Sequence, residues 1–190
     1  MQPRISIITI CYNAASTITR TLRSVSAQTY PNIQYLIIDG ASKDNTLELV
    51  RELAPEAEIY SERDKGIYDA MNKGLDRATG DYVWYVNAGD ALVSPTTVED
   101  LVRATCTGDS LPDVLYGDTR LIDAEDHDLG LRRLRPPHQL DWRSFRAGML
   151  VCHQAFVAKR TISPHYDLSY RFSADVDWCI RVLKLSLIHI

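Results

Sequence analysis

The sequence predicts an α/β domain built on a largely parallel central sheet, and three observations support this fold class. Apolar, β-branched runs alternate with segments of helical spacing through residues 1–90. Three of the four runs are almost continuously apolar, which is typical of parallel strands covered by helices on both faces. Each run also ends in a polar turn, as strands do in ligand-binding α/β sheets.

Strand and helix are expected to alternate through the first half. The expected strands are Ile5–Ile10, Ile33–Ile38, Glu58–Tyr60 and Asp81–Val86, and the expected helices lie within Ser16–Gln28, Thr46–Leu53 and Ile67–Arg77. Asp44 stands at the position of an N-cap for the second helix. Units of strand, helix and strand with these lengths place neighbouring strands in parallel.

The remaining residues follow a less regular pattern. Helices are predicted over Val98–Ala104 and Ala174–Leu185, and strands over Val114–Asp118, Thr119–Asp123 and Leu150–Val157. Residues 126–137 mix charge, glycine and paired prolines, which indicates an exposed ribbon or loop. Because the chain has no repeat, low-complexity tract or clear linker, we expect a single domain over residues 1–190.

The composition argues against several classes of protein. The chain has 190 residues, of which 45% are hydrophobic and 24% charged, as in an ordinary globular domain. Its net charge of −4 lacks the basic footprint of nucleic-acid-binding proteins, so no nucleic-acid partner is expected. No run approaches the roughly 20 apolar residues of a transmembrane helix, and the N-terminus has no signal-peptide pattern, so we expect a cytoplasmic protein. The four cysteines form no CxxC pair, which argues against a zinc cluster.

The polar turns after the four expected strands are the candidate binding residues. They are Thr9–Asn13, Asp39–Asp44, Glu62–Gly66 and Asn87–Asp90. Because parallel strands end at one edge of a sheet, we expect these turns to converge. Asp90, with Gly89 beside it, suits a Mg²⁺ or Mn²⁺ that bridges two phosphates, although the same residues would form a simple turn. Asp39 could accept hydrogen bonds from a nucleoside.

The third turn opens a helix that could receive phosphate groups. Lys65 or Lys73 could balance the charge of a diphosphate, and the helix N-terminus offers free amide donors. A solvated surface helix would carry similar charges, so both interpretations stay open.

Several long segments together resemble family 2 glycosyltransferases with the GT-A fold, a Rossmann-like nucleotide-binding fold. The first segment is ISIITICYNAASTITRTLRSVSAQTYPNIQYLIIDGASKDNT, and the second is SERDKGIYDAMNKGLDRATGDYVWYVNAGD. The second closely resembles a subgroup associated with bacterial cell-surface polysaccharide synthesis. Agreement returns at His153-Gln154 and at residues 174–177. The resemblance implies a donor-binding half over residues 1–90 and an acceptor-side half over 91–190. The family normally continues with a further segment, so a truncated acceptor side is expected.

The resemblance also implies roles for residues near the donor. Thr9 and Tyr12 would line the nucleotide base pocket, and Asp39 would hydrogen-bond the base. Asn87 to Asp90 would stand for the family's DxD element, with Asp90 as the metal ligand and Asn87 as a neutral partner. The family's Arg-Asn pair is Met71-Asn72 in this chain, which keeps Asn72 as a donor-site residue, while Lys65 or Lys73 would replace the missing arginine.

On the acceptor side, the resemblance implies that Asp175 is the general base of an inverting transfer. The family usually has Glu-Asp at this point, and this chain has Ala174-Asp175. Asp177, two residues further along the expected helix, would point to a different face. His153 would lie near the donor sugar, with a buried core histidine as the alternative. Trp142, Trp178 and Tyr170 could stack on sugar rings, although such aromatics are more often part of the core.

The implied reaction is metal-assisted transfer of a sugar, with a UDP-sugar favoured, to a saccharide or lipid-linked acceptor. Peripheral association with the inner face of the cytoplasmic membrane is expected from such acceptors. Two alternatives remain. A nucleotidyltransferase would normally carry a Gly-rich phosphate loop, and neither GxGxxG nor GxxxxGK[ST] occurs. A non-catalytic nucleotide-sugar-binding module would not need Asp175.

Overall fold

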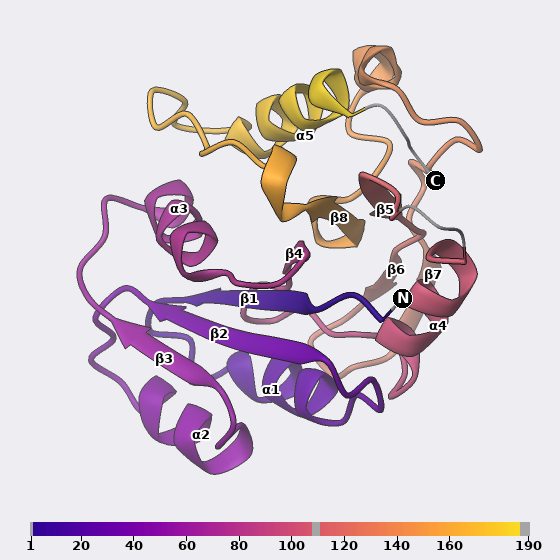
Figure 1. Ribbon diagram of the computed structural model, residues 1–190. Helices are drawn as coiled ribbons and strands as arrows, with labels where there is room; N and C mark the ends of the chain where they lie inside the picture. Colours follow the sequence, from indigo (N-terminus) through magenta and orange to yellow (C-terminus); the bar gives the residue numbers. More distant parts are fainter. Residues whose placement is uncertain (1, 108–110, 187–190) are drawn as a thin grey trace.

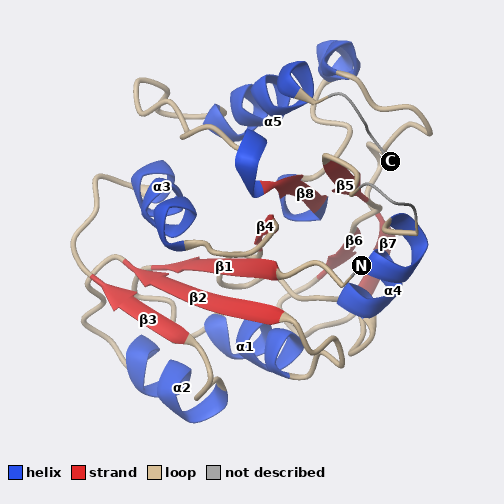
Figure 2. Ribbon diagram, viewed as in Figure 1, coloured by secondary structure: helices blue, strands red, loops and turns tan. Residues whose placement is uncertain are grey.

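The alternating runs of the first half form parallel strands, as their apolar composition predicts. The computed structural model describes residues 2–107 and 111–186. Its strands are β1 Ile5–Cys11, β2 Ile33–Asp39, β3 Glu58–Ser61, β4 Tyr82–Tyr85, β5 Val114–Tyr116, β6 Arg120–Ile122, β7 Asp128–Leu131 and β8 Phe156–Lys159. One six-stranded sheet has the order β3-β2-β1-β4-β8-β5 (Figure 2). Strands β1 to β4 are parallel, and β8 runs antiparallel to both β4 and β5.

Helices cover both faces of this sheet. They are α1 Ile18–Ser26, α2 Thr46–Leu53, α3 Ile67–Arg77, α4 Thr97–Thr105 and α5 Ala174–Leu185, with short 3-10 helices at Trp142–Ala147, His153–Ala155 and Arg160–Ile162. In Figure 1, α1 and α2 lie on one side of the sheet, and α3 and α5 lie on the other. Alternate residues of β1 therefore enter two separate cores, Ile7 on the α1 side and Ile8 on the α3 side. This confirms the prediction of a sheet buried on both faces.

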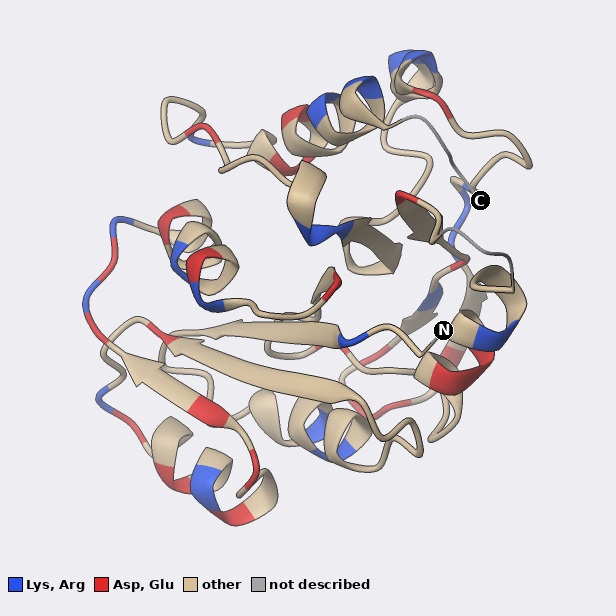
Figure 3. Cartoon of the chain, in the orientation of Figure 1, with Lys and Arg blue, Asp and Glu red and all other residues tan. Residues whose placement is uncertain are grey.

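Close packing fixes α3 against β1. A Cβ placed on Gly74 would lie 2.6 Å from Cγ2 of Ile8, so only glycine allows the helix to approach this strand. The position of α3 matters because its first turn reaches the edge where the parallel strands end. Charged residues lie mainly on the helices and loops, and few lie on the central strands (Figure 3).

The second half departs from the sequence predictions in one strand. Residues Leu150–Val157 do not form a single strand, because a 3-10 turn occupies His153–Ala155 and β8 begins only at Phe156. The amide of Ala155 bonds to the carbonyl of Cys152, and this turn directs the His153 ring into an aromatic core. The predicted ribbon is confirmed in part, since β7 pairs antiparallel with β6.

Two further observations complete the fold. The N-cap of α2 is Asn45, so the prediction for Asp44 was wrong by one residue. Asp44 nevertheless accepts a hydrogen bond from the Thr46 amide at 3.1 Å and so still supports the helix start. Among the described helices, none combines the length and the apolar character needed to cross a membrane.

Candidate functional site

The turns after β1, β2 and β3 are bound to one another, as the parallel sheet predicts. The amide of Gly40 donates to the carbonyl of Cys11 at 2.9 Å, and the amide of Glu62 donates to the carbonyl of Asp39 at 3.0 Å. Asn13 joins the first two turns, because its amide donates to Oγ of Ser42 at 2.8 Å. These turns therefore form one continuous polar edge.

The turn after β4 joins this edge through threonine hydroxyls. Thr21 of α1 donates to the carbonyl of Asp90 at 2.6 Å and accepts from the amide of Gly89 at 3.0 Å. Gly89 has φ +104°, a left-handed conformation that favours glycine. Sequence reasoning did not identify Thr21, although a polar residue on the apolar face of a helix is a signal of such a contact. Thr21 thus holds the turn that carries the expected metal ligand.

Thr9 has a related role beneath the turn. It is fully buried in β1, and its hydroxyl donates to the carbonyl of Val86 at 2.7 Å. Val86 directly precedes Asn87, so Thr9 fixes the point where the β4 turn begins. A direct contact between Thr9 and a nucleotide base stays a prediction.

Asn87 and Asp90 present side-chain oxygens of different kinds in the β4 turn. Oδ1 of Asn87 is buried and has no hydrogen-bond partner within residues 2–107 and 111–186. Asp90 is half-buried, and burial raises the pKa of its carboxyl, although a hydrogen bond with the Gln154 side chain acts in the opposite direction. Buried acceptors without enough donors are costly, and carboxylate and amide oxygens are ligands that Mg²⁺ and Mn²⁺ prefer. The donor set of this turn therefore fits a divalent cation.

Asp39 lies at the end of β2 with its carboxylate already enclosed. Only 1% of the residue is exposed. Its oxygens accept hydrogen bonds from the Ser42 amide at 3.0 Å, the Ser42 hydroxyl, the Ser61 hydroxyl at 2.6 Å and the Cys11 thiol at 3.7 Å. Burial, with Asp39 beside it, raises the pKa of the Cys11 thiol, which therefore stays protonated. A base bound to Asp39 would have to replace one of these donors.

Tyr12 is the most open of the expected donor residues. It is 60% exposed, and its ring lies against Gly40. A Cβ on Gly40 would lie 3.2 Å from Cδ2 of Tyr12 and 2.7 Å from Oδ2 of Asp64, so a larger residue here would displace the Asp64 side chain. An exposed aromatic ring at this edge is available for stacking on a nucleotide base, which stays a prediction.

The two candidate lysines differ in what their ammonium groups contact. Nζ of Lys73 donates to the carbonyl of Arg63 at 2.7 Å and pairs with Glu62 at 3.4 Å, so it holds the loop before α3. Lys65 is exposed in the same loop, and its backbone amide donates to Oδ2 of Asp69 at 2.9 Å. Lys65 is therefore the better placed of the two to meet a diphosphate.

Asn72 joins two elements of the fold, and its contact with a donor stays a prediction. The residue is only 8% exposed, and its amide group forms two hydrogen bonds with the backbone of Tyr166, at 3.0 and 2.7 Å. These bonds attach α3 to the loop before α5. Asn72 therefore supports the framework through one bond to each end of its amide group.

His153 lies in an aromatic cluster, and its neighbour Gln154 faces the site. The His153 ring is 4% exposed, contacts Tyr85 and Trp178, and its Nε2 lies 2.7 Å from the Tyr166 hydroxyl. Burial lowers the pKa of His153 to about 4, with Asp175 partly opposing this effect, so the ring is neutral at pH 7. The buried core histidine is the alternative that the structure supports. The side chain of Gln154, which sequence reasoning did not select, instead lies close enough to Asp90 to lower the pKa of its carboxyl.

Asp175 lies in the first turn of α5 and is half-buried. Its Oδ1 accepts a hydrogen bond from the Tyr68 hydroxyl at 3.3 Å. Asp177 instead accepts a hydrogen bond from Nε of Arg181 at 2.6 Å. The two carboxylates therefore have different partners, as the helical spacing predicts.

A cleft of about 440 Å³ lies between the start of α3 and the loop before α5. It is lined by Lys65–Asp69 and Leu168–Arg171. Tyr170 is exposed on its wall, whereas Trp178 is fully buried and stacks on Tyr166, with ring centroids 5.1 Å apart. Trp142 is half-buried beneath the guanidinium of Arg143. Of the three aromatics considered for sugar stacking, Tyr170 alone lines this cleft.

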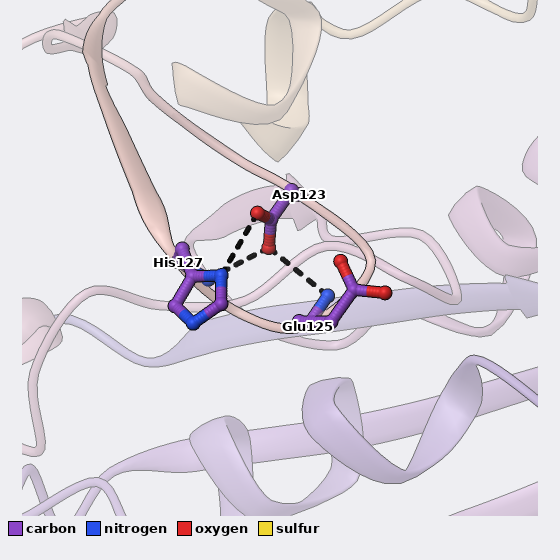
Figure 4. Close-up of side chains that lie close together, drawn as sticks. All are labelled: Asp123, Glu125 and His127. Carbon is purple, nitrogen blue, oxygen red and sulfur yellow. Dashed lines mark hydrogen bonds and ion pairs between the residues drawn. The ribbon is translucent and has the colours of Figure 1, made fainter.

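A second group of metal-ligand types lies in the β6–β7 turn, away from these strand ends. The side chains of Asp123, Glu125 and His127 offer atoms within 4.8 Å of one another (Figure 4). Asp123 accepts hydrogen bonds from the amides of Glu125 at 3.0 Å and His127 at 2.8 Å, and contacts Nδ1 of His127 at 3.0 Å. The Arg20 guanidinium also donates to the Asp123 carbonyl. These bonds show that the three side chains belong to a turn that is hydrogen-bonded internally and attached to α1.

Comparison with known proteins agrees with this geometry. Residues 6–163 match the model of the family described as "Glycosyl transferase family 2". The chain belongs to this family. It is 33% identical to an uncharacterized glycosyltransferase of Mycobacterium tuberculosis over 186 residues, which cover 94% of this chain and 68% of the relative. It is 34% identical to a PGL/p-HBAD biosynthesis glycosyltransferase of Mycobacterium bovis over 188 residues, which cover 94% of this chain and 69% of the relative. The chain is therefore a glycosyltransferase, and the prediction of this enzyme class is confirmed.

Solved structures of glycosyltransferases share the fold. Residues 1–349 of Staphylococcus aureus TarS in complex with UDP-GlcNAc superpose with a TM-score of 0.78 at 15% identity, over 97% of this chain and 54% of that one. The mannosyltransferase PcManGT of Pyrobaculum calidifontis, in complex with GDP-Man and Mn²⁺, gives a TM-score of 0.55 at 25% identity over 66% of this chain and 37% of that one. The chain thus spans about half of the TarS fragment's length. The predicted GT-A fold is confirmed.

Proposed function

We propose that this family 2 glycosyltransferase moves a sugar from a nucleotide-sugar donor to a saccharide or lipid-linked acceptor with inversion at the anomeric carbon. Residues 1–90 would bind the donor, and residues 91–190 would contribute to the acceptor side. Asp90 is proposed to hold a divalent metal, and Asp175 is proposed to be the general base. A place at the cytoplasmic face of a membrane is part of this proposal for lipid-linked acceptors.

One observation carries the proposal. The short segment His153–Ala155 lies beside both carboxylates that are proposed to act in the reaction. The Gln154 side chain is close enough to Asp90 to lower the pKa of that carboxyl, and Asp175 is close enough to His153 to raise the histidine pKa. Two adjacent residues thus approach the proposed metal ligand and the proposed general base.

Inversion needs one general base and no covalent nucleophile. Asp175 would accept the proton of the acceptor hydroxyl as the hydroxyl oxygen forms a bond with the anomeric carbon. The bond between that carbon and the diphosphate breaks on the opposite face, and its electron pair leaves with the nucleoside diphosphate. General base catalysis of this kind typically contributes roughly 10²–10⁴-fold.

The β4 turn fits the metal that such donors usually bring. Asp90 and Asn87 would hold the ion through their side-chain oxygens, since the Asn87 oxygen has no partner among the described residues. When bound, the metal supplies positive charge that stabilises the departing diphosphate. Lys65, exposed at the same edge, would add a second positive charge.

A UDP-sugar is the favoured donor. The TarS complex with UDP-GlcNAc and the PcManGT complex with GDP-Man and Mn²⁺ support a nucleotide sugar and a metal for this fold. Tyr12 would stack on the base and Asp39 would hydrogen-bond it, with Thr9 fixing the neighbouring turn.

The test is a donor screen. UDP-, GDP- and dTDP-sugars are mixed with the protein with and without Mn²⁺, and nucleotide release and the Tm are measured. We expect a UDP-sugar to raise the Tm and to release UDP when Mn²⁺ is present. If no nucleotide sugar changes the Tm under either condition, the proposal is wrong.

Asp175→Asn then separates catalysis from binding. This variant should keep the donor-dependent rise in Tm and lose transfer by roughly 10²–10⁴-fold. Asp177→Asn is the matched control, because it lies in the same helical turn but bonds Arg181. A wild-type chain that binds donor without releasing nucleotide would support a non-catalytic module. Release of pyrophosphate from a nucleoside triphosphate and a sugar phosphate would support a nucleotidyltransferase.

A further inference from the structure

Tyr68 connects the first turn of α3 to the first turn of α5. Its hydroxyl bonds to the Asp175 carboxylate, a residue 107 positions away in the sequence. We propose that Tyr68 is a positioning residue: it orients the carboxylate of the general base and does not itself touch the reacting atoms. This inference rests on the proposed function of Asp175. It concerns the direction in which the carboxylate points.

The Tyr68 ring is itself held in place. It stacks on Tyr166, with ring centroids 5.8 Å apart and planes at 16°. Tyr166 is fixed on all sides, through its backbone by Asn72, through its hydroxyl by His153 and through its ring by Trp178. A side chain that is packed and hydrogen-bonded in this way loses little further freedom when it orients a neighbour.

This network explains two residues that sequence reasoning placed in the donor site. Asn72 and His153 both bind Tyr166, one through its backbone and one through its hydroxyl. Tyr166 in turn supports Tyr68. Asn72 and His153 thus help to fix the ring on which Tyr68 stacks.

Among the described residues around Asp175, Tyr68 is the one whose side chain donates a hydrogen bond to the carboxylate. Besides Tyr68 of α3, they are His153 of the 3-10 helix, Tyr166 of the preceding loop and Cys179 of α5. Burial raises the pKa of Tyr166 and of Cys179 and lowers that of His153 to about 4, so all three are neutral near pH 7. The pKa of Tyr68 is raised by burial and by Asp175, so its hydroxyl keeps the proton that it donates.

The first experiment compares kinetics of Tyr68→Phe with wild type. UDP-glucose, UDP-galactose and UDP-N-acetylglucosamine serve as donors, and a panel of p-nitrophenyl pyranosides as acceptors. Phenylalanine keeps the stacking on Tyr166 and removes only the hydroxyl. We expect kcat to fall about tenfold, the scale of one hydrogen bond to a charged group, while KM for the donor stays within about twofold. An unchanged kcat overturns the proposal.

Tyr60→Phe is the matched control. The Tyr60 hydroxyl also donates to a carboxylate, that of Glu58 at 3.1 Å, but on the surface of β3. Loss of this hydroxyl should leave kcat at the wild-type value. An equal fall in both variants would show a general effect of losing a tyrosine hydroxyl and would overturn the proposal.

The second experiment needs no substrate. The ionisation of Tyr68 is followed by ultraviolet absorbance after a rapid pH jump, before the protein unfolds, and Tyr68→Phe identifies its signal. In Asp175→Asn the Tyr68 pKa should fall, because the negative charge that opposes the phenolate is gone. An unchanged Tyr68 pKa overturns the contact on which the proposal depends. This titration gives its answer even if no donor is transferred, so the two proposals can fail separately.

Discussion

An aspartate lies at or just beyond the ends of both β2 and β4, but the two carboxylates differ in their hydrogen bonding. Asp39, the last residue of β2, is buried and accepts hydrogen bonds from a backbone amide, two serine hydroxyls and a thiol. Asp90, after β4, is half-buried with a pKa that burial raises, and the neighbouring Asn87 oxygen has no partner in the described part of the chain.

This difference separates a carboxylate that is paired within the fold from an oxygen that has no partner among the described residues. A carboxylate that accepts four hydrogen bonds stabilises its own turn before any ligand binds. A buried oxygen without a donor costs free energy, and a bound cation removes that cost. The β4 turn is therefore expected to affect activity more than stability, and the β2 turn to affect stability strongly.

The largest expected effect is that of Asp90→Asn on activity. The substitution keeps the shape of the side chain and removes the charge that would hold the metal. We expect Mn²⁺-dependent release of nucleotide to fall by roughly 10²-fold or more, as for loss of an electrostatic group at the leaving atom. Stability without metal should stay equal or rise, because burial disfavours the charged carboxylate. Nucleotide release with a Mn²⁺ titration and urea unfolding measure the two quantities.

Asp123→Asn is the matched control for the metal. Asp123 belongs to the other group of potential ligands, in the β6–β7 turn. This variant should keep the Mn²⁺ response of the wild type. If Asp123→Asn removes the response and Asp90→Asn does not, the contrast between the two turns is lost.

The second prediction concerns the β2 turn. Asp39→Ala removes the common acceptor of the Ser42, Ser61 and Cys11 side chains, of which only the Cys11 thiol is buried. We expect the free energy of unfolding to fall by about 3 kcal/mol, because several hydrogen bonds to one charged group are lost together. Urea unfolding measures this change. Ser42→Ala should cost less, because the Ser61 bond remains. A fall no larger than that of Asp90→Asn would contradict the comparison.

The helices of the first half could be predicted from the sequence because local patterns determine them. The bounds expected for Thr46–Leu53 and Ile67–Arg77 match α2 and α3, since helical spacing and the flanking turns are local features. The error at Leu150–Val157 has a non-local cause. The apolar run continues into a 3-10 turn whose His153 ring packs in an aromatic cluster formed by residues distant in the sequence.

Individual site residues were harder to predict because their partners are distant in sequence. Asn72 bonds a backbone 94 residues away, so no local pattern shows that its amide is already used. The pair His153-Gln154 was recognised, but spacing alone did not show that the histidine enters the core and the glutamine faces Asp90. Asp90 and Asp175 followed from their motifs, and their roles stay proposals.

A pH titration tests the aromatic cluster separately from both turns. The folded pKa of His153 is about 4, below its ordinary value of 6.5. Between these values the unfolded chain binds more protons than the folded chain, so stability should decrease as the pH falls from 6.5 to 4. Across this whole pH range His153 changes the free energy of unfolding by about 3 kcal/mol, and the change is smaller over part of the range. His153→Gln should remove this part of the pH dependence in urea unfolding.

The control for that titration is His138→Gln, at an exposed position. It should keep the wild-type pH dependence. An equal change in both variants would mean that burial of His153 is not the cause.

The smallest expected effect, and the sharpest for the comparison, is that of Asn87→Ala. Removing a buried oxygen that has no partner in the described chain should leave the metal-free protein as stable as wild type or more stable by up to about 1 kcal/mol. The same variant should bind the UDP-sugar more weakly in the presence of Mn²⁺, since one oxygen ligand is lost. Urea unfolding without metal measures the stability, and the donor-dependent rise in Tm with Mn²⁺ measures the binding. The first should stay equal or increase, and the second should decrease. Asn45→Ala, whose side chain makes no cap hydrogen bond at the start of α2, should leave donor binding unchanged. If Asn87→Ala lowers stability as Asp39→Ala does, the β4 turn is a structural turn like that of β2, and the metal must be sought elsewhere.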